Sequence, residues 1–263
     1  AAGVSVILLH ADTAVQLKTV GRGIKPAPVP LALSEGQSIE IPEGAQARLL
    51  INGRPRTLHG PASVSTQALG EAGGRGSDDA GFLDSLGLRR QVGMVAGATR
   101  SGAVRPGKPV VVRPLPRSSA VGIGEIRWKC EACGEQKVSV IKMWPRSSLW
   151  RGTGSGQVTY SGRELAPGVY GIQLNGGPPS VFDVIDAPRA QRIESAAKTV
   201  NEGVVEPYQR LSVEVALWWL SDVKSEALRR LDAAILAHPD DPRFKALRAQ
   251  YEEGLDAHLR SAP

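Results

Sequence analysis

The two cysteines of the chain lie three positions apart, in the segment Trp128-Lys-Cys-Glu-Ala-Cys-Gly134. A structural zinc site takes four ligands, and the sequence has neither a second cysteine pair nor a His-x-x-x-His spacing to complete one. A redox-active Cys-x-x-Cys normally opens a helix, whose N-terminus lowers the thiol pKa. Here the flanking residues are typical of strands, which favours a disulfide between Cys130 and Cys133 at the tip of a β-hairpin. Redox activity is the alternative.

Acid–base or phosphate chemistry finds little support in the rest of the sequence. The glycine-rich segments 122–124 and 152–156 are not followed by Lys-Ser or Lys-Thr, which a phosphate-binding loop requires. None of the four histidines has a serine, cysteine or carboxylate at the spacing of a catalytic triad: His10, His59, His238 and His258. We therefore expect no catalytic residues, no metal site and no cofactor, and the chain is not expected to be an enzyme.

Four tryptophans are candidates for contact with a partner, because tryptophan is enriched at the centres of protein interfaces. Trp218 and Trp219 are neighbours in a helical segment, so their side chains point about 100° apart. The pair predicts either an exposed aromatic anchor or the burial of both rings against different parts of the fold. Trp144 and Trp150 flank a proline-containing loop and form a second, similar candidate.

Charge and hydropathy narrow the classes of partner. The chain has 263 residues and a formal net charge of +6, but its 32 Lys and Arg residues are spread along the sequence. Aromatic residues are not interleaved with them, as a platform for nucleic-acid bases would require. We therefore expect no nucleic-acid partner. No stretch reaches the roughly 18 apolar residues of a membrane span, so none is expected in this chain.

The N-terminal residues Ala1-Ala2-Gly3-Val4 are small, as is typical of the residues next to a signal-peptidase cut. A disulfide is also typical of an oxidising compartment. The sequence therefore predicts a protein of the periplasm or cell envelope, exported with its signal peptide removed.

Residues 1–68 predict a small β domain. Val4–Leu9 is a mostly apolar run, and Ala14–Val20 alternates apolar and polar residues with the period of a strand. Asn52-Gly53 suits a two-residue hairpin, because both residues accept a positive φ. These features predict short strands joined by tight turns.

Part of this region carries an ordered motif. Its elements are Leu33-x-x-Gly36-x-x-Ile39, Gly44-Ala45-x-Ala47-x-Leu49, the Asn52-Gly53 turn and a closing Leu58-x-Gly60-Pro61-Ala62. This order resembles the FecR-like periplasmic domain family over about a quarter of the chain. The resemblance implies a small β domain outside the cytoplasm that binds, senses or scaffolds, and it implies no active site.

Residues 69–108 are rich in glycine and charge, which predicts a linker. Within it, residues 80–88 could form a short amphipathic helix. Residues 109–187 return to strand-like alternation, with an expected hairpin of Ile123–Lys129 and Lys137–Met143 around the cysteines.

The segment Leu165-Ala-Pro-Gly-Val-Tyr170 resembles the late-strand corner of immunoglobulin-like and fibronectin-like sandwiches. The resemblance implies a β-sandwich of about seven short strands for residues 109–187. In such a corner the Tyr170 hydroxyl returns to a nearby backbone group. We expect Trp128 in the core of this sandwich.

Residues 188–263 predict about four helices, over 190–201, 208–220, 225–236 and 244–255, from apolar residues spaced three and four apart. Asp241-Pro242 is a helix-start signal. The segment Ala-x-His-Pro-Asp-Asp-Pro between helices resembles the junction of tetratricopeptide-type repeats. About one repeat is visible, so we expect a helical cap and not a solenoid.

The sequence thus predicts a mainly β fold with an α-helical C-terminal region: a FecR-like β domain, a linker, an immunoglobulin-like sandwich and a tetratricopeptide-like helical region. The function expected is non-catalytic interaction or scaffolding in the periplasm, as a subunit of a larger complex with other envelope proteins. The alternative is binding of the cell wall, with basic residues and loop tryptophans contacting peptidoglycan or another acidic polymer.

Overall fold

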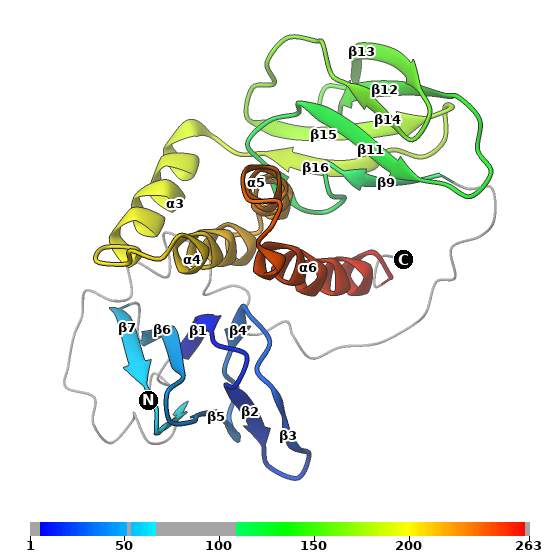
Figure 1. Ribbon diagram of the computed structural model, residues 1–263. Helices are drawn as coiled ribbons and strands as arrows, with labels where there is room; N and C mark the ends of the chain where they lie inside the picture. The colour runs from blue at the N-terminus through cyan, green and yellow to red at the C-terminus, as the bar shows by residue number, and fades with distance from the viewer. Residues whose placement is uncertain (1–5, 52–53, 67–108, 261–263) are drawn as a thin grey trace. The chain divides into compact units, whose positions relative to one another are not determined.

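A computed structural model describes residues 6–51, 54–66 and 109–260 of the chain, with side chains to residue 252 (Figure 1). The expected linker 69–108, its short helix over 80–88 and the Asn52-Gly53 turn lie outside these residues. The described fold is mainly β, and helices follow the strands toward the C-terminal end. The expected fold class is therefore confirmed. Of the described helices, none is both long and apolar enough to cross a membrane.

The described residues pack as two compact units, and each unit combines strands with part of the helical region. The first, here called the N-terminal unit, contains residues 6–66, 192–221 and 230–250. The second, here called the sandwich unit, contains residues 109–191, 222–229 and 251–260. The helical residues are thus shared between both units.

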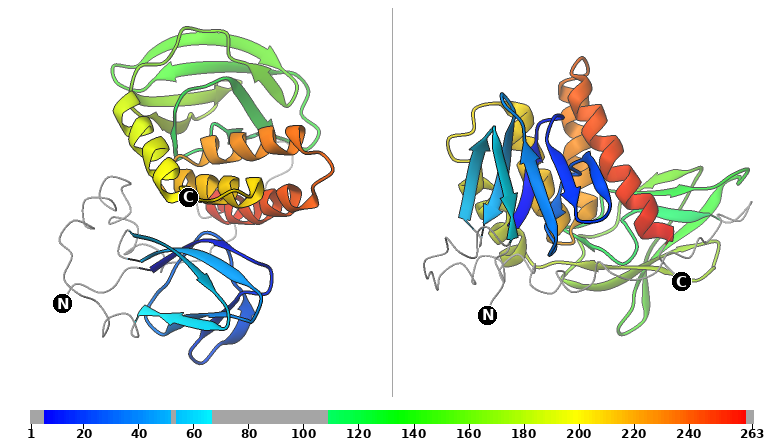
Figure 2. Two further views of the ribbon diagram at one scale, coloured as in Figure 1. Left: turned by 60° about the vertical axis from the view of Figure 1, so that its left-hand side comes forward. Right: turned by 90° about the horizontal axis from the view of Figure 1, so that it is seen from below.

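Two four-stranded antiparallel sheets form the β part of the N-terminal unit, with strand orders β4-β1-β6-β7 and β3-β2-β5-β8. These strands are coloured blue to cyan in Figure 2. The strands are β1 (Val6–Ala11), β2 (Gln16–Thr19), β3 (Gly23–Pro26), β4 (Leu31–Ala32), β5 (Gln37–Ile41), β6 (Gln46–Ile51), β7 (Arg54–His59) and β8 (Ala62–Ser65). Their shared core is built from Val6, Leu8, Val15, Leu33, Ile39, Ile41, Ala45, Ala47, Leu49 and Val64.

Strand β1 is buried along almost its whole length. Val6 and Leu8 face the core between the sheets. Ile7 and its cross-strand partner Leu50 lie outside that core, and both are nevertheless fully buried. Helix α4 (Pro207–Leu220) packs against β1, so the strand is covered on two faces. A strand covered on both faces reads as a continuous apolar run, which explains the run seen in the sequence.

Four helices follow in the described residues: α3 (Ala187–Val200), α4 (Pro207–Leu220), α5 (Lys224–Ala237) and α6 (Pro242–Arg260). The last three begin within two residues of the starts expected from the sequence. Acidic side chains cap three of the four. Asp186, Glu206 and Asp241 accept hydrogen bonds from the backbone N–H groups of the first turns, at 2.8, 2.7 and 3.0 Å. Such caps satisfy N–H groups that have no partner within the helix.

The sandwich unit contains a five-stranded sheet of order β10-β16-β15-β12-β13 and a three-stranded sheet of order β14-β11-β9. The strands are β9 (Val110–Arg113), β10 (Ser119–Ala120), β11 (Glu125–Lys129), β12 (Gln136–Lys142), β13 (Ser147–Gly154), β14 (Gln157–Thr159), β15 (Gly168–Leu174) and β16 (Ser180–Val184). Inward side chains of both sheets form one core, in which Trp128 is 5% exposed, as expected. The Tyr170 hydroxyl donates to the Ala166 carbonyl at 2.7 Å, which confirms the expected hydrogen bond to a nearby backbone group.

The expected hairpin around the cysteines is not formed. Strand β11 pairs with β14 and β9, whereas β12 pairs with β13 and β15 in the other sheet. The segment between β11 and β12 therefore crosses from one sheet of the sandwich to the other. Strand periodicity predicts that two strands exist, but it does not specify which strands pair.

Within the sandwich unit, the start of α5 is hydrogen-bonded to the segment that leads into β10. The Asp222 carbonyl accepts from the Ser119 N–H at 2.8 Å and from the Ser118 hydroxyl at 2.7 Å. The Ser225 hydroxyl accepts from the Leu115 N–H at 2.8 Å. These bonds explain why residues 222–229 belong to the sandwich unit.

The glycines of the motif between Leu33 and Val64 have definite backbone roles. Gly36 and Gly44 both have a φ of +77°, which side-chain-bearing residues rarely adopt. Gly60 makes a close approach, because a Cβ atom there would lie 1.8 Å from the Pro42 carbonyl oxygen. The motif is thus a set of turn and contact requirements of this small β domain.

We predict that Gly60→Ala lowers the free energy of unfolding by about 2 kcal/mol, because the new methyl group must displace backbone atoms at Pro42. Urea unfolding followed by circular dichroism measures this loss. The control is Gly124→Ala, because no heavy atom lies within 4 Å of a Cβ built at Gly124. Equal stability of the two variants would contradict the close approach.

Candidate functional site

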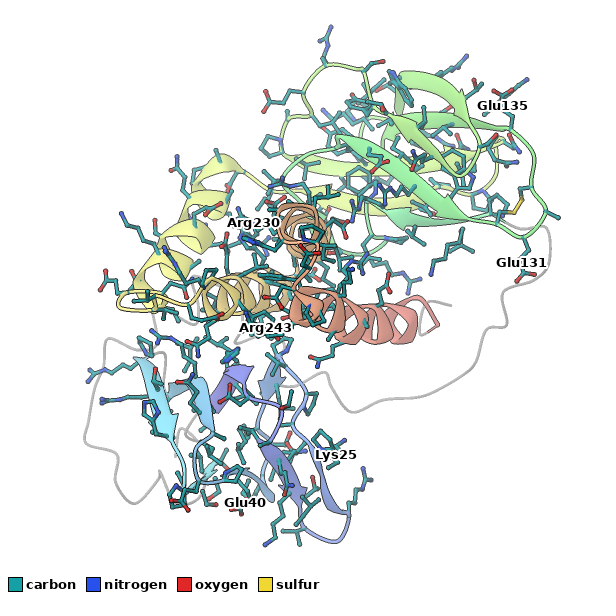
Figure 3. All side chains as sticks on the ribbon, viewed as in Figure 1. Lys25, Glu40, Glu131, Glu135, Arg230 and Arg243 are labelled. Carbon is teal, nitrogen blue, oxygen red and sulfur yellow. A yellow bond between two sulfur atoms is a disulfide. The ribbon has the colours of Figure 1, made fainter. Side chains whose placement is uncertain are left out.

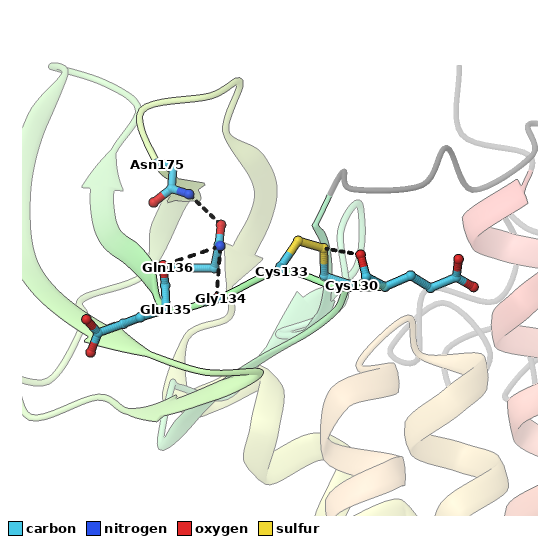
Figure 4. Close-up of a disulfide and its surroundings, with 7 residues drawn as sticks. Cys130, Cys133, Gly134, Glu135, Gln136 and Asn175 are labelled. Carbon is cyan, nitrogen blue, oxygen red and sulfur yellow. Dashed lines mark hydrogen bonds between the residues drawn. A yellow bond between two sulfur atoms is a disulfide. The ribbon is translucent and has the colours of Figure 1, made fainter.

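Cys130 and Cys133 form the expected disulfide, with their Cα atoms 5.6 Å apart, in the segment that crosses between the two sheets (Figure 4). Hydrogen bonds hold the residues that follow. The Gln136 amide donates to the Gly134 carbonyl at 3.1 Å and accepts from the Asn175 amide. The disulfide therefore closes a small loop of residues 130–133. The chain that follows this loop is held at Gln136 by Asn175, which comes directly after β15.

Trp218 is buried in the helical part of the fold. Its side chain is 1% exposed, and the Arg230 guanidinium lies over its ring at 4.8 Å from the ring centroid. Arg230, labelled in Figure 3, also forms ion pairs with Glu194 of α3 and Glu214 of α4. The ring is thus enclosed where α3, α4 and α5 meet, whereas the neighbouring Trp219 is partly exposed.

Trp150 supports strand β13 from its inner face. Its ring meets that of Tyr160 edge-on, with centroids 5.3 Å apart, and its indole N–H donates to the Ser161 hydroxyl at 3.1 Å. The ring also extends over Gly152, where a Cβ atom would lie 2.4 Å from it. Glycine at position 152 therefore leaves the space that this ring occupies.

Trp144 differs from the other three candidate tryptophans because its side chain is 80% exposed. It lies in the turn that joins β12 to β13. Leu149 on β13 and Val169 on β15 are also exposed, at 39% and 36%. Val169 belongs to the same end of the sheet, because its carbonyl accepts from the Met143 N–H at 3.0 Å. This end of the five-stranded sheet thus exposes apolar side chains.

The other end of the same sheet carries polar side chains on its outer face. On β12, Val138 and Val140 point into the core, so Lys137 and Ser139 point outward. The pairing with β13 places Thr153 opposite Lys137 and Arg151 opposite Ser139. These four side chains and Asn175 line an open hollow of about 780 Å³, here called the polar hollow.

Both cations of the polar hollow lack an acidic partner. Neither Lys137 nor Arg151 forms an ion pair within the described residues, whereas Arg127 on the other sheet pairs with Glu125 at 2.8 Å. Glu135, labelled in Figure 3, precedes β12 and makes no ion pair with Lys137. The polar hollow therefore presents two cations and several hydrogen-bonding groups, which suits an anionic ligand.

Strand β13 forms the edge of the five-stranded sheet. At eight residues it is the longest of the described strands, and within the described residues its only strand partner is β12. An edge strand presents unpaired N–H and C=O groups to the solvent, and these groups can pair with a strand of another chain. The polar hollow and the exposed Trp144 both lie beside this edge.

A buried titratable side chain lies in the N-terminal unit. His10, on β1, is 4% exposed, and its ring meets Tyr208 of α4 edge-on with centroids 5.8 Å apart. Its Nε2 atom lies 3.6 Å from Asp12 Oδ1 and has no hydrogen-bond partner in the described part of the chain. Burial lowers the pKa of His10, although the carboxylates of Asp12 and Glu206 act to raise it and Arg48 acts with burial to lower it.

A cation covers the other side of this aromatic contact. The Arg243 guanidinium lies 4.8 Å from the centre of the Tyr208 ring and pairs with Glu206 at 3.0 Å and with Asp241 at 2.7 Å (Figure 3). Burial raises the pKa of Tyr208, and Arg243 opposes that rise. On the sheet side, the Arg48 guanidinium donates to the Val200 carbonyl at the end of α3. Charged and aromatic groups thus surround the contact of β1 with α4.

These surfaces carry cationic, hydrogen-bonding and apolar side chains. Among the described residues, no three or more His, Cys, Asp or Glu side chains are grouped so that they could hold a metal ion. Lys137, Arg151 and the open edge of β13 are features that the sequence pattern alone did not indicate. The alternation of Lys137 and Ser139 with buried valines is the signal that could have identified the outer face.

Comparisons with known proteins return no relationship. The chain matches no family model, and neither a curated protein nor a solved structure shows significant similarity to it. Its function is therefore inferred from its own residues.

We predict that the N-terminal unit loses stability as the pH falls below about 6.5, the ordinary pKa of histidine in an unfolded chain. Because the folded state holds His10 neutral, the unfolded state binds the extra proton and is favoured in acid. His10→Phe keeps an aromatic ring and removes the proton site. Its stability relative to the wild type should therefore grow by up to about 1.4 kcal/mol per pH unit below that pH.

Urea unfolding between about pH 5 and about pH 7 measures this difference. His59→Phe is the control, because His59 is exposed on β7 of the same unit. A His10→Phe variant whose stability follows the same pH dependence as the wild type would show that His10 is not held neutral.

Proposed function

We propose that this chain is a non-catalytic interaction or scaffold protein of a bacterial cell envelope, which binds a protein partner through the β12–β13 end of its sandwich unit. The observation that carries this proposal is the exposed ring of Trp144, which is 80% accessible at the end of the sheet that also exposes Leu149 and Val169. Large aromatic rings at the centre of an interface contribute much of its binding energy. Trp144 is the one tryptophan among the exposed large apolar side chains of the described residues.

The rigidity of this end of the sandwich also supports a binding role. The inner face of β13 is held by Trp150, whose ring contacts Tyr160 with centroids 5.3 Å apart and whose indole N–H donates to the Ser161 hydroxyl at 3.1 Å. A surface held in one conformation loses less conformational entropy when it binds. Trp144 is thus displayed on a hairpin whose inner face is already fixed.

The envelope location rests on two features. The Cys130–Cys133 disulfide is the kind of bond that persists in an oxidising compartment. The motif between Leu33 and Val64 resembles FecR-like periplasmic domains, and its glycines are used for turns. Both features support a periplasmic subunit of a larger assembly.

A second candidate is binding of an acidic polymer such as peptidoglycan. The polar hollow favours it, because Lys137 and Arg151 have no acidic partner in the described residues and would attract anionic groups. Binding of this kind weakens steeply as salt screens the charges. Sedimentation with purified cell-wall sacculi at rising ionic strength separates it from the first candidate.

We predict that a photo-crosslinking amino acid at position 144 captures one envelope protein in stoichiometric amount. The same group at position 24, an exposed apolar site on β3 in the other unit, is the control and should not capture it. Trp144→Ala should reduce co-purification of that protein by about tenfold or more, because the variant lacks the exposed aromatic ring that the partner would cover. Capture of cell-wall fragments alone would favour the polymer binder.

A further inference from the structure

We infer that the partner binds by adding an extended strand to the open edge of β13, and that this strand carries acidic side chains at alternate positions. The inference rests on the proposed function and specifies how that same end of the sandwich recognises its ligand. Three observations carry it: the open edge, the unpaired cations on its outer face, and the apolar side chains at its beginning.

The open edge supplies the backbone groups. Strand β13 runs for eight residues, and the described residues place a paired strand on one of its sides only, at β12. Addition of a strand to such an edge satisfies the backbone N–H and C=O groups of both chains. Trp150 and Gly152 hold the inner face of β13, so the edge is ordered before a partner arrives.

The charges of the outer face select the side chains of the added strand. Residues that point outward from β13 alternate along it, and they include Arg151 and Thr153. Lys137 lies directly behind Thr153 in the cross-strand row, and Ser139 lies directly behind Arg151. A side chain on the added strand lies about 5 Å from the one it faces on β13, so carboxylates two positions apart would meet both rows.

The beginning of the strand supplies an apolar contact. Trp144 precedes β13, and Leu149 is exposed at the irregularity in its pairing with β12, where the register shifts between Val140 and Ile141. An extended partner segment would therefore place an apolar residue near Trp144 and acidic residues further along. The partner sequence should therefore have an apolar residue at one end of the segment and acidic residues toward the other.

The same features argue against a second copy of this chain as the occupant. Pairing of two β13 strands would bring the Arg151 side chains of both copies to one outer face, in addition to both Lys137 side chains. Like charges that face one another across strands are destabilising.

The test uses the full chain and an eight-residue peptide that alternates valine and glutamate, with blocked ends. We expect the peptide to slow amide hydrogen exchange in residues 147–154 and to bind with an affinity that a double charge reversal, Lys137→Glu with Arg151→Glu, weakens by about tenfold or more. Lys129→Glu is the matched control, since Lys129 is exposed on β11 in the other sheet. That variant should bind the peptide with an affinity within about twofold of the wild type, because an exposed charge on the other sheet contributes little to binding at this edge.

A peptide with the same side chains and N-methylated backbone amides separates strand addition from simple charge attraction. It keeps every carboxylate but cannot donate backbone hydrogen bonds, so we expect its binding to be lost. Equal binding of both peptides would overturn strand addition and indicate a charged patch for acidic polymers. Absence of protection at residues 147–154, or protection that depends on protein concentration without peptide, would also overturn it.

The fate of the proposed function is read separately. If the crosslinker at position 144 captures a protein partner whose binding is unaffected by Arg151→Glu and Lys137→Glu, the interaction role stands and strand addition by an acidic segment is wrong. If no protein is captured at position 144, the proposed function itself fails. Circular dichroism of the charge-reversed variants, whose altered side chains are exposed, establishes that they fold.

Discussion

The alternation of side chains along β12 is the constraint on which the polar hollow depends. Val138 and Val140 must fill the core of the sandwich, so Lys137 and Ser139 are forced to its outer face. Pairing with β13 then fixes Arg151 and Thr153 beside them. The valines that fill the core on one side of the sheet therefore place polar and cationic residues on its other side.

The two units differ in what covers the outer face of a sheet. In the N-terminal unit, α4 covers the outer side of β1, so Ile7 and Leu50 are buried and even His10 loses its contact with water. In the sandwich unit, the outer face of β12 and β13 carries exposed polar side chains at Lys137, Arg151 and Thr153. A covered face contributes stability through apolar burial, whereas an exposed face with an open edge is available for recognition.

The tryptophans differ in the same way between packed and exposed environments. Trp218 and Trp150 are placed by ion pairs, ring contacts and a glycine that leaves room for the indole. Each stabilises an element from within. Trp144 is 80% exposed and makes no such contact with the described residues, and it precedes the strand whose edge is open. Residue type alone does not separate these roles; the environment does.

The sequence by itself determined the elements and many of their boundaries. Apolar residues spaced three and four apart and the Asp241-Pro242 start signal located the helices, and apolar–polar alternation located strands such as β2. The sequence also determined the disulfide and the Tyr170 hydrogen bond, because both are set by residues close in the chain. Only the tertiary structure decided that β11 and β12 belong to different sheets, that α4 covers β1, and that β13 lies at an edge. These are pairings between distant segments, and a local pattern specifies which face of a strand is apolar without specifying what lies against it.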